Sequence, residues 1–331
     1  MDNFLSRSNL EYFSRRLNTT IPSDLSDLTN MQLNRFTRLH DIGGYVPEAS
    51  NVFYVNTGDV NAVDDNLDPL QGYSWSKPFK TIQYAINRVK TQLALPNVTI
   101  NVAPGTYNET LSISGIFNID IIGRNTNNTG ADPETVIIDP GSVTKSTIDV
   151  SSCAMASISR MCVRGSLYNN GAEQYHFAII RAWRSNVILS YDIVELRSRN
   201  QFGLLSSTDS YIGIMRERFT IRGSVSSHIL RSDWNSTIGL ESFVSPSPTQ
   251  GIYIQGPMTI YNNGLNSVAG SGALVQGDCQ GNISVIDVQI GSSGTITGKK
   301  YELHHQSMLT EVSKLPNTTI AGTVATGSSA A

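Results

Sequence analysis

The sequence predicts an all-β fold, namely a single-stranded right-handed parallel β-helix with a short helical N-terminal segment and a capping helix. The first observation behind this prediction is a repeat: the apolar pairs Ile179-Ile180, Leu204-Leu205 and Ile229-Leu230 follow one another at intervals of 25 residues. The second is composition, because 94 Ser, Thr and Asn residues stand against 51 charged ones. Stacked coils explain both, since short strands must alternate with small polar turn residues.

Each apolar pair is followed by a polar bend and a second short strand. These second strands are residues 187–189, 212–214 and 238–240, and third strands follow at 194–196 and 219–221. The unit recurs earlier, at 147–163, and later, at 274–285. Coils of this kind pair with their neighbours at roughly 4.8 Å and must stack to bury their apolar faces. An immunoglobulin-type sandwich has no reason to keep such a register.

Residues 1–50 form the first of three predicted regions. Leu10, Phe13 and Leu17 have helical spacing, and a second short helix around Met31 is expected to end before Gly43-Gly44. Two short helices bury little by themselves, so we expect this segment to dock on another chain or a neighbouring protein. A frayed or cleavable leader is the alternative.

Residues 51–296 form the predicted β-helix. Ile82, Ala85, Ile86 and Val89 fall at helical spacing and predict a helix over about 79–91. The open end of a β-helix is an unpaired sheet edge, and this helix is placed to cover the N-terminal end. From Val98 onward the alternation is that of strands.

Residues 297–331 are predicted to form a C-terminal cap and a flexible tail, because a Gly/Ser/Ala/Thr-rich end cannot bury a core. On a strand, His304 and His305 would point to opposite faces, so an interface or surface role is favoured over a shared metal ion. His176 and His228 stand alone and are interpreted as structural.

The three cysteines, Cys153, Cys162 and Cys279, have no metal-type spacing. The chain also contains neither G-x-G-x-x-G nor a Walker motif. We therefore predict no metal site and no cofactor.

Two stretches of sequence resemble known families. F-Y-V-N at 53–56, P-F-K-T-I-Q-Y-A-I-N at 78–87 and V-T-I-N-V-A-P-G-T-Y-N-E at 98–109 resemble the opening of the pectate-lyase-like superfamily, whose fold is the right-handed β-helix. G-T-I-T-G-K-K-Y-E-L at 294–303 looks like segments near the ends of bacteriophage tail-fibre and tailspike proteins. Together these resemblances imply a homotrimeric virion component, located at the phage tail or capsid surface.

The superfamily also contains sugar-cleaving enzymes. The pectin-esterase opening G-x-Y-x-E occurs at Gly105, Tyr107 and Glu109, but this element is also structural, and the later catalytic elements are absent. The polygalacturonase set is absent too, and Asp64-Asp65 lies in a loop before the coils. The resemblance therefore implies no catalytic residue, and the chain is predicted to be a binding protein rather than an enzyme.

One acidic constellation keeps a catalytic alternative open. Asp192, Glu217 and Glu241 are spaced by 25 and 24 residues and would stack on three successive coils. Neighbouring carboxylates near 5 Å suit a retaining glycosidase. The competing interpretation is a salt-bridged edge, because Arg197 and Arg222 share the spacing.

A second constellation predicts glycan binding. Aromatic and polar side chains fall at equivalent bends of successive coils: Trp183, Asp209, Tyr211, Asp233, Trp234 and Asn235. Aromatic faces stack on sugars, and carboxylates and amides bind hydroxyl groups. Packing of the tryptophans between subunits is the alternative.

The predicted function is therefore a structural or host-recognition component of a phage particle that binds host surface polysaccharide. A tailspike-type depolymerase and a capsid decoration or adaptor protein are the alternatives. Other virion proteins are expected to bind residues 1–50. The net charge of −3 and the lack of an apolar run of 18 residues predict neither nucleic-acid binding nor membrane insertion.

Overall fold

The computed structural model describes residues 51–65, 67–68, 70–91, 97–168, 177–198, 201–215, 219–223, 225–226, 228–241, 252–260, 271–286 and 290–331. The predicted docking segment at 1–50, His176 and Glu217 lie outside these residues. All that follows concerns the described part of the chain.

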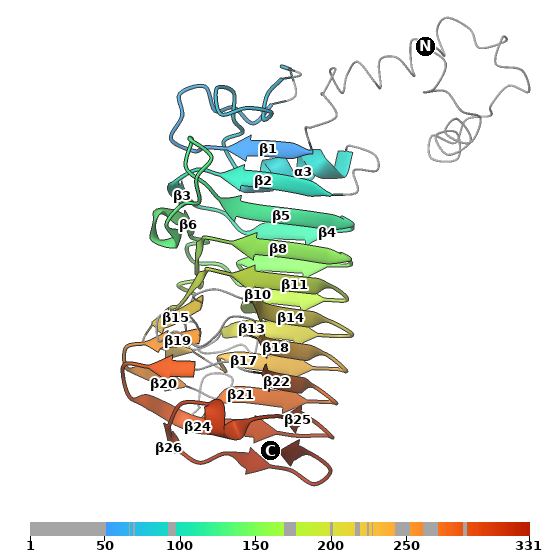
Figure 1. Ribbon diagram of the computed structural model, residues 1–331, viewed down its shortest axis with the longest axis vertical. Coiled ribbons are helices and arrows are strands. Elements are labelled where there is room, and N and C mark those ends of the chain that lie inside the picture. The colour runs from blue at the N-terminus through green and yellow to red at the C-terminus, as the bar shows by residue number, and fades with distance from the viewer. Residues whose placement is uncertain are drawn as a thin grey trace, which may run out of the picture. The chain divides into compact units, whose positions relative to one another are not determined.

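The strands form three sheets, and every pairing between named strands is parallel (Figure 1). The first sheet contains β1 (Val52–Val55), β2 (Val98–Val102), β5 (Asn118–Gly123), β8 (Met155–Ser159), β11 (Asn186–Ser190), β14 (Tyr211–Met215), β18 (Thr237–Glu241), β22 (Asn282–Ile286), β25 (Met308–Leu309) and β28 (Ser329–Ala330). The third contains β3 (Gly105–Tyr107), β6 (Val136–Ile138), β9 (Cys162–Arg164), β12 (Ile193–Leu196), β15 (Phe219–Gly223), β19 (Ile252–Gln255) and β23 (Ile290–Ser292).

The second sheet lies between these two in chain order. Its strands are β4 (Leu111–Ser114), β7 (Ile148–Ser151), β10 (Ala178–Trp183), β13 (Phe202–Ser207), β16 (Val225–Ser226), β17 (Leu230–Asp233), β20 (Met258–Ile260), β21 (Ala273–Asp278) and β24 (Ile296–Leu303), with β26 (Thr318–Ile320) and β27 (Thr323–Val324) paired to β24. Two 3₁₀ turns, Pro133–Thr135 and Val312–Lys314, complete the described elements. This succession of sheets confirms the predicted parallel β-helix.

Alternation within each strand builds the core. Val187, Ile212, Ile238 and Ile283 pair in register on successive first-sheet strands, and all four are buried. Each such side chain contributes about 1.5–3 kcal/mol relative to exposure. Because every coil repeats this column, the core runs through the whole stack.

The repeat differs by one residue between sheets. In the first sheet Val187 pairs with Ile212, which is the predicted spacing of 25. In the second sheet Ile180 pairs with Leu204, 24 residues later, so the predicted pairing of Ile179 with Leu204 is wrong by one position. The extra residue lies in the intervening bend, which has residues 184–185 in one coil and 208–210 in the next.

Helix α3 (Ile82–Thr91) covers the N-terminal end of the stack, as predicted, and contacts β1, β2 and β4. Its first backbone amides are bound by two carboxylates. Glu109 accepts from the N–H groups of Ile82 (2.9 Å) and Gln83 (2.8 Å), and Asp64 accepts from the N–H of Thr81 (3.1 Å). Burial raises the pKa of Glu109, and these hydrogen bonds oppose that shift. Helix N-termini attract such anions.

Replacing this cap should destabilise the N-terminal end. We expect Glu109→Ala to lower the free energy of unfolding by about 2–3 kcal/mol, because two partly buried amides lose their acceptor. Urea unfolding followed by circular dichroism measures the change. Glu109→Gln keeps one acceptor oxygen and should lose less; equal losses for the two variants would contradict this account of the cap.

The C-terminal region differs from the expected cap with a flexible tail. β24 crosses the predicted boundary at 296/297, and β25 and β28 extend the first sheet to Ala330. The hydroxyl of Ser328 accepts the N–H of Ser307 at 3.1 Å. Backbone pairing and small polar turn residues continue the stack here, and Leu303, Leu309 and Leu315 extend its buried core.

Candidate functional site

The bends that join second-sheet strands to first-sheet strands form one regular edge of the molecule, on the right of Figure 1. We call residues 183–185, 207–210, 233–236, 278–281 and 304–307 the turn edge. In four of these bends two successive residues have positive φ: Thr208-Asp209, Trp234-Asn235, Cys279-Gln280 and His305-Gln306. Backbone bonds such as Asp209 N–H to Trp234 O (3.1 Å) hold neighbouring bends together.

Buried serines fix the inner side of this edge. The hydroxyls of Ser185, Ser210 and Ser236 each accept a backbone N–H from the preceding coil. The donors are Cys153 (3.0 Å), Ser185 (3.2 Å) and Ser210 (3.1 Å). Such side-chain bonds satisfy amides that the turn would otherwise leave without partners. The outward side chains therefore stand on a rigid, repeating support.

Two predicted glycan-binding aromatics lie on the outer side of the turn edge. Trp183 and Trp234 are 45% and 62% exposed as whole residues. Trp183 pairs with Ser207, which pairs with Asp233 beside Trp234, so the two tryptophans are two coils apart. Two strand spacings correspond to about 10 Å along the stack.

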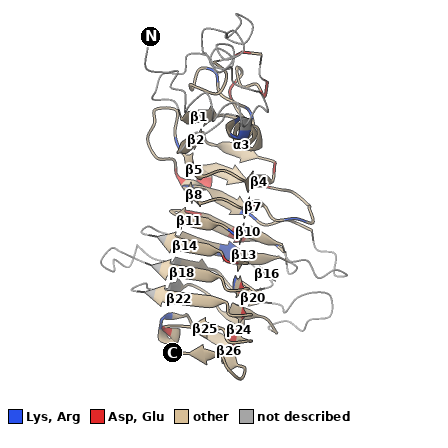
Figure 2. Cartoon of the chain, turned by 90° about the vertical axis from the view of Figure 1, so that its right-hand side faces the viewer, with Lys and Arg blue, Asp and Glu red and all other residues tan. Residues whose placement is uncertain are grey.

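Two of the predicted polar residues lie in the same bends as the tryptophans or in the bend between them. The side-chain amide of Asn235 donates to Asp209 Oδ1 at 2.9 Å, and both side chains are exposed. A similar bond joins Gln280 to Gln306 at 3.2 Å in later bends. Carboxylate and amide groups thus bond between bends beside the tryptophans and again in later coils of the turn edge. In Figure 2, which faces this edge, most of the ribbon is tan, the colour of residues other than Lys, Arg, Asp and Glu.

The other two candidates, Asp233 and Tyr211, are less accessible. Asp233 is buried and accepts from Arg231 Nε at 2.7 Å. The ring of Tyr211 covers Gly213 and Gly239, where an added Cβ would meet it at 2.7 and 2.5 Å. Of the six predicted residues, Trp183, Asp209, Trp234 and Asn235 therefore present the most accessible surface.

Of the three members of the predicted acidic stack, the structure describes Asp192 and Glu241, while Glu217 lies outside the described residues. Asp192 lies in the bend between β11 and β12, is fully buried, and accepts the N–H groups of Met161 (2.9 Å) and Ser190 (3.2 Å). Glu241 ends β18 and pairs with Met215. Burial raises the pKa of Asp192 well above its ordinary value. Its contacts are those of a structural acceptor.

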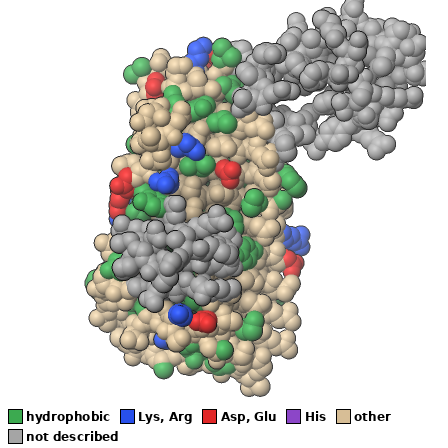
Figure 3. Space-filling view, in the orientation of Figure 1, with side chains coloured by type: hydrophobic (Ala, Val, Ile, Leu, Met, Phe, Trp, Pro, Cys, Tyr) green, Lys and Arg blue, Asp and Glu red, His purple; other side chains and the backbone are tan. Residues whose placement is uncertain are grey.

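The arginines with the predicted 25-residue spacing, Arg197 and Arg222, form ion pairs at the third sheet. Arg164, Glu195 and Arg222 are in register, and Glu195 contacts Arg164 at 3.6 Å and Arg222 at 2.9 Å. Asp139 bonds Arg164 and Arg197 at 3.2 and 2.9 Å. Burial alone would raise the pKa of Asp139, but hydrogen bonds from Gly141 and the two arginines lower it. Figure 3 shows charges of both signs interspersed on one face.

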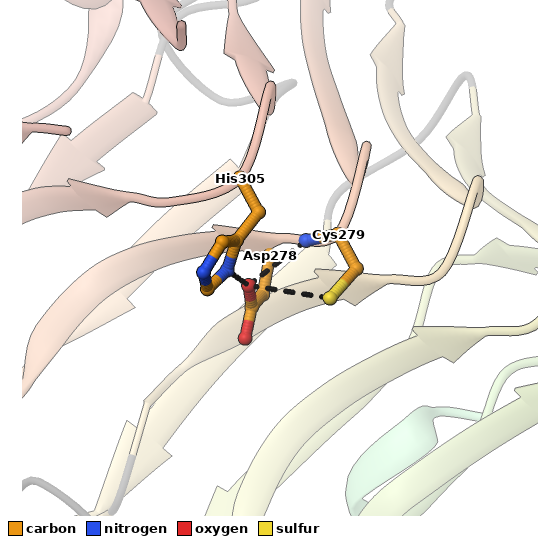
Figure 4. Close-up of side chains that lie close together, drawn as sticks. All are labelled: Asp278, Cys279 and His305. Atoms are coloured by element: carbon orange, nitrogen blue, oxygen red, sulfur yellow. Dashed lines mark hydrogen bonds and ion pairs between the residues drawn. The ribbon is translucent and has the colours of Figure 1, made fainter. Parts of the chain in front are cut away.

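A third cluster, unpredicted by the sequence, lies in the later bends of the turn edge. His305 Nδ1 lies 2.5 Å from Asp278 Oδ1, which also accepts the N–H of Cys279 at 2.9 Å and its thiol at 3.5 Å (Figure 4). Burial works to raise the pKa of Asp278, but the bonds from His305 and Cys279 lower it. Burial and the Asp278 charge raise the pKa of the Cys279 thiol.

The two other histidines in the described part of the chain differ in setting. His304 Nε2 lies 3.8 Å from Glu302 Oε1, apart from the contacts of its neighbour His305. His228 is buried, and its Nδ1 accepts the N–H of Ala273 at 3.1 Å.

Comparison with known proteins gives no relative for this chain. No family model, no curated protein and no solved structure matches it. Within the described residues, no helix is both long and apolar enough to cross a bilayer.

Proposed function

We propose that this protein is a host-recognition component of a bacteriophage particle and that its turn edge binds a host surface glycan. The observation that carries the proposal is the pair of exposed rings, Trp183 and Trp234, beside the bonded Asp209 and Asn235 side chains. Indole faces stack on the apolar faces of sugars, and the carboxylate and amide bind their hydroxyl groups.

Rigidity makes this surface suitable for binding. The bends are held by backbone bonds between coils and by the buried serines Ser185, Ser210 and Ser236. A site on such a support loses little conformational freedom when a flexible polysaccharide binds. The elongated edge also matches a linear polymer better than a closed pocket would.

The assignment to a phage particle rests on the sequence resemblances at 53–109 and 294–303. We further propose a homotrimer, in which three weak glycan sites act together through avidity. Light scattering after gel filtration should then give three times the chain mass of 36.0 kDa. The mass of a single chain would contradict the homotrimer and, with it, binding through avidity.

Attachment to host cells tests the glycan proposal. Purified full-length protein should bind the bacterium on which the particle grows, and soluble polysaccharide extracted from that bacterium should compete. Lack of binding to cells and to the polysaccharide would contradict the proposal and favour the decoration or adaptor alternative. Release of oligosaccharides from the polysaccharide would instead support a depolymerase.

Residues 1–50 provide a separate prediction about attachment to the particle. A variant that lacks them should keep the β-strand circular dichroism spectrum and the glycan binding of the full chain. We expect it to be missing from assembled particles, because the proposed docking segment is gone. Incorporation at the level of the full chain, measured by immunoblotting of purified particles, would show that attachment uses another surface.

A further inference from the structure

Three different ligand types converge where two successive bends of the turn edge meet. Asp278 ends β21 and Cys279 follows it, while His305 follows β24 in the next coil (Figure 4). The carboxylate oxygen, the thiol sulfur and an imidazole nitrogen all lie within 4.8 Å of one another. Cys279 and His305 both have positive φ, and the N–H of Gln280 bonds His305 O at 2.9 Å.

We propose that Asp278, Cys279 and His305 bind a divalent transition-metal ion, with Zn²⁺ as the best-matched species. Zn²⁺ takes sulfur, imidazole nitrogen and carboxylate oxygen at about 2.0–2.3 Å in tetrahedral geometry. The three ligand atoms lie within 4.8 Å of one another, which is the scale of the separations between ligands around one ion. Mg²⁺ and Ca²⁺ are disfavoured because they require oxygen ligands.

Metal binding would change the protonation of two of the three ligand side chains. The Cys279 thiol would lose its proton to solvent when the thiolate coordinates the metal. Coordination by His305 Nδ1 requires this nitrogen to carry no proton, so the neutral ring would carry its single proton on Nε2. Affinity should therefore rise with pH, because the Cys279 thiol must lose its proton to bind the metal.

The proposed metal site is open to solvent and lies between two adjacent coils. His305 is 73% exposed at its side chain, so an ion can enter from solvent, and a water molecule can complete the coordination. The metal would join two adjacent coils near the C-terminal end of the stack. This inference is independent of the proposed glycan binding.

Cobalt titration of the full-length protein, kept reduced with a phosphine, tests the proposal. Co²⁺ should give a thiolate-to-metal charge-transfer band at one equivalent per chain. Cys153 and Cys162 are buried, so the band would report Cys279. Zn²⁺ should displace Co²⁺ and raise the thermal unfolding midpoint, because it binds only the folded state.

Three variants decide the assignment. Cys279→Ser should abolish the charge-transfer band, and His305→Gln should weaken Zn²⁺ binding by about tenfold or more. His304→Gln is the matched control and should bind as the original chain does, since His304 contacts Glu302 instead. No charge-transfer band, or Zn²⁺ affinity unchanged in both Cys279→Ser and His305→Gln, would overturn the proposal.

Discussion

The double variant Trp183→Ala/Trp234→Ala should lose most of its attachment to host cells. Both rings are exposed at the turn edge, and neither belongs to the main core. Each stacked aromatic ring typically contributes about 0.5–1.5 kcal/mol beyond its buried area. Loss of both should therefore weaken binding by about one to two orders of magnitude, and a trimer would amplify the loss. Binding of labelled protein to cells measures the effect.

Tyr253→Ala is the matched control for this experiment. Tyr253 is an exposed aromatic on β19 of the third sheet, away from the turn edge. It should bind cells as the original chain does, and all variants should keep their thermal unfolding midpoints. Undiminished attachment of the double tryptophan variant would show that the turn edge is not the binding surface. Equal losses in the Tyr253 control would point to another face.

Asp192→Ala should give the largest loss of stability among single carboxylate variants. Asp192 is fully buried, and its two oxygens accept the N–H groups of Met161 and Ser190. Each buried amide that loses its acceptor costs about 1–3 kcal/mol, so we expect a loss of about 2–4 kcal/mol, offset in part by the removed buried charge. Chemical denaturation at neutral pH measures it. A change below about 0.5 kcal/mol would contradict the structural role.

Asp192→Asn separates charge from hydrogen bonding. The asparagine amide keeps one acceptor oxygen, so the loss of stability should be smaller in Asp192→Asn than in Asp192→Ala. Burial raises the pKa of Asp192 in the folded state, so the folded protein binds the proton more tightly than the unfolded chain. The stability from this group is present below the unfolded pKa of 3.8 and declines as pH rises toward the folded pKa. The stability of the original chain relative to Asp192→Asn should therefore increase as pH falls. A stability difference that does not depend on pH would contradict the raised pKa.

Apolar periodicity was sufficient to predict the coils. The first-sheet strands Val187–Leu189 and Ile212–Ile214 align as the sequence indicated, because alternation fixes which side chains face inward. The bends were harder. One added turn residue between Ser207 and Tyr211 shifts the second-sheet register relative to the first, and apolar patterning does not report turn length.

The acidic alternative stays a prediction because Glu217 lies outside the described residues, but the coils do not keep one repeat length throughout. Spacings of 25 and 24 residues aligned Asp192, Glu217 and Glu241, whereas the paired third-sheet residues Ile193 and Thr220 are 27 residues apart. Glu195 therefore meets Arg222, and Glu241 lies on a different sheet. Residue types alone did not show that Asp192 turns inward to bind backbone amides.

The cluster around Asp278 was missed for a related reason. Cys279 and His305 are 26 residues apart in the sequence, which is one coil, but metal-binding patterns are usually sought at short spacings. Applying the coil repeat to cysteine and histidine, and not only to apolar residues, would have placed them together. The glycan candidates Trp183 and Trp234 were found because that repeat was applied to aromatic residues.

The location of the protein on intact particles tests the central claim most directly. Gold-labelled antibody against the β-helix, viewed by electron microscopy, should label the tail tip or baseplate, where a host-recognition protein must act. Label over the head, or no label on particles that contain every other structural protein, would contradict host recognition. The exposed tryptophans of the turn edge would then be contacts between protein chains.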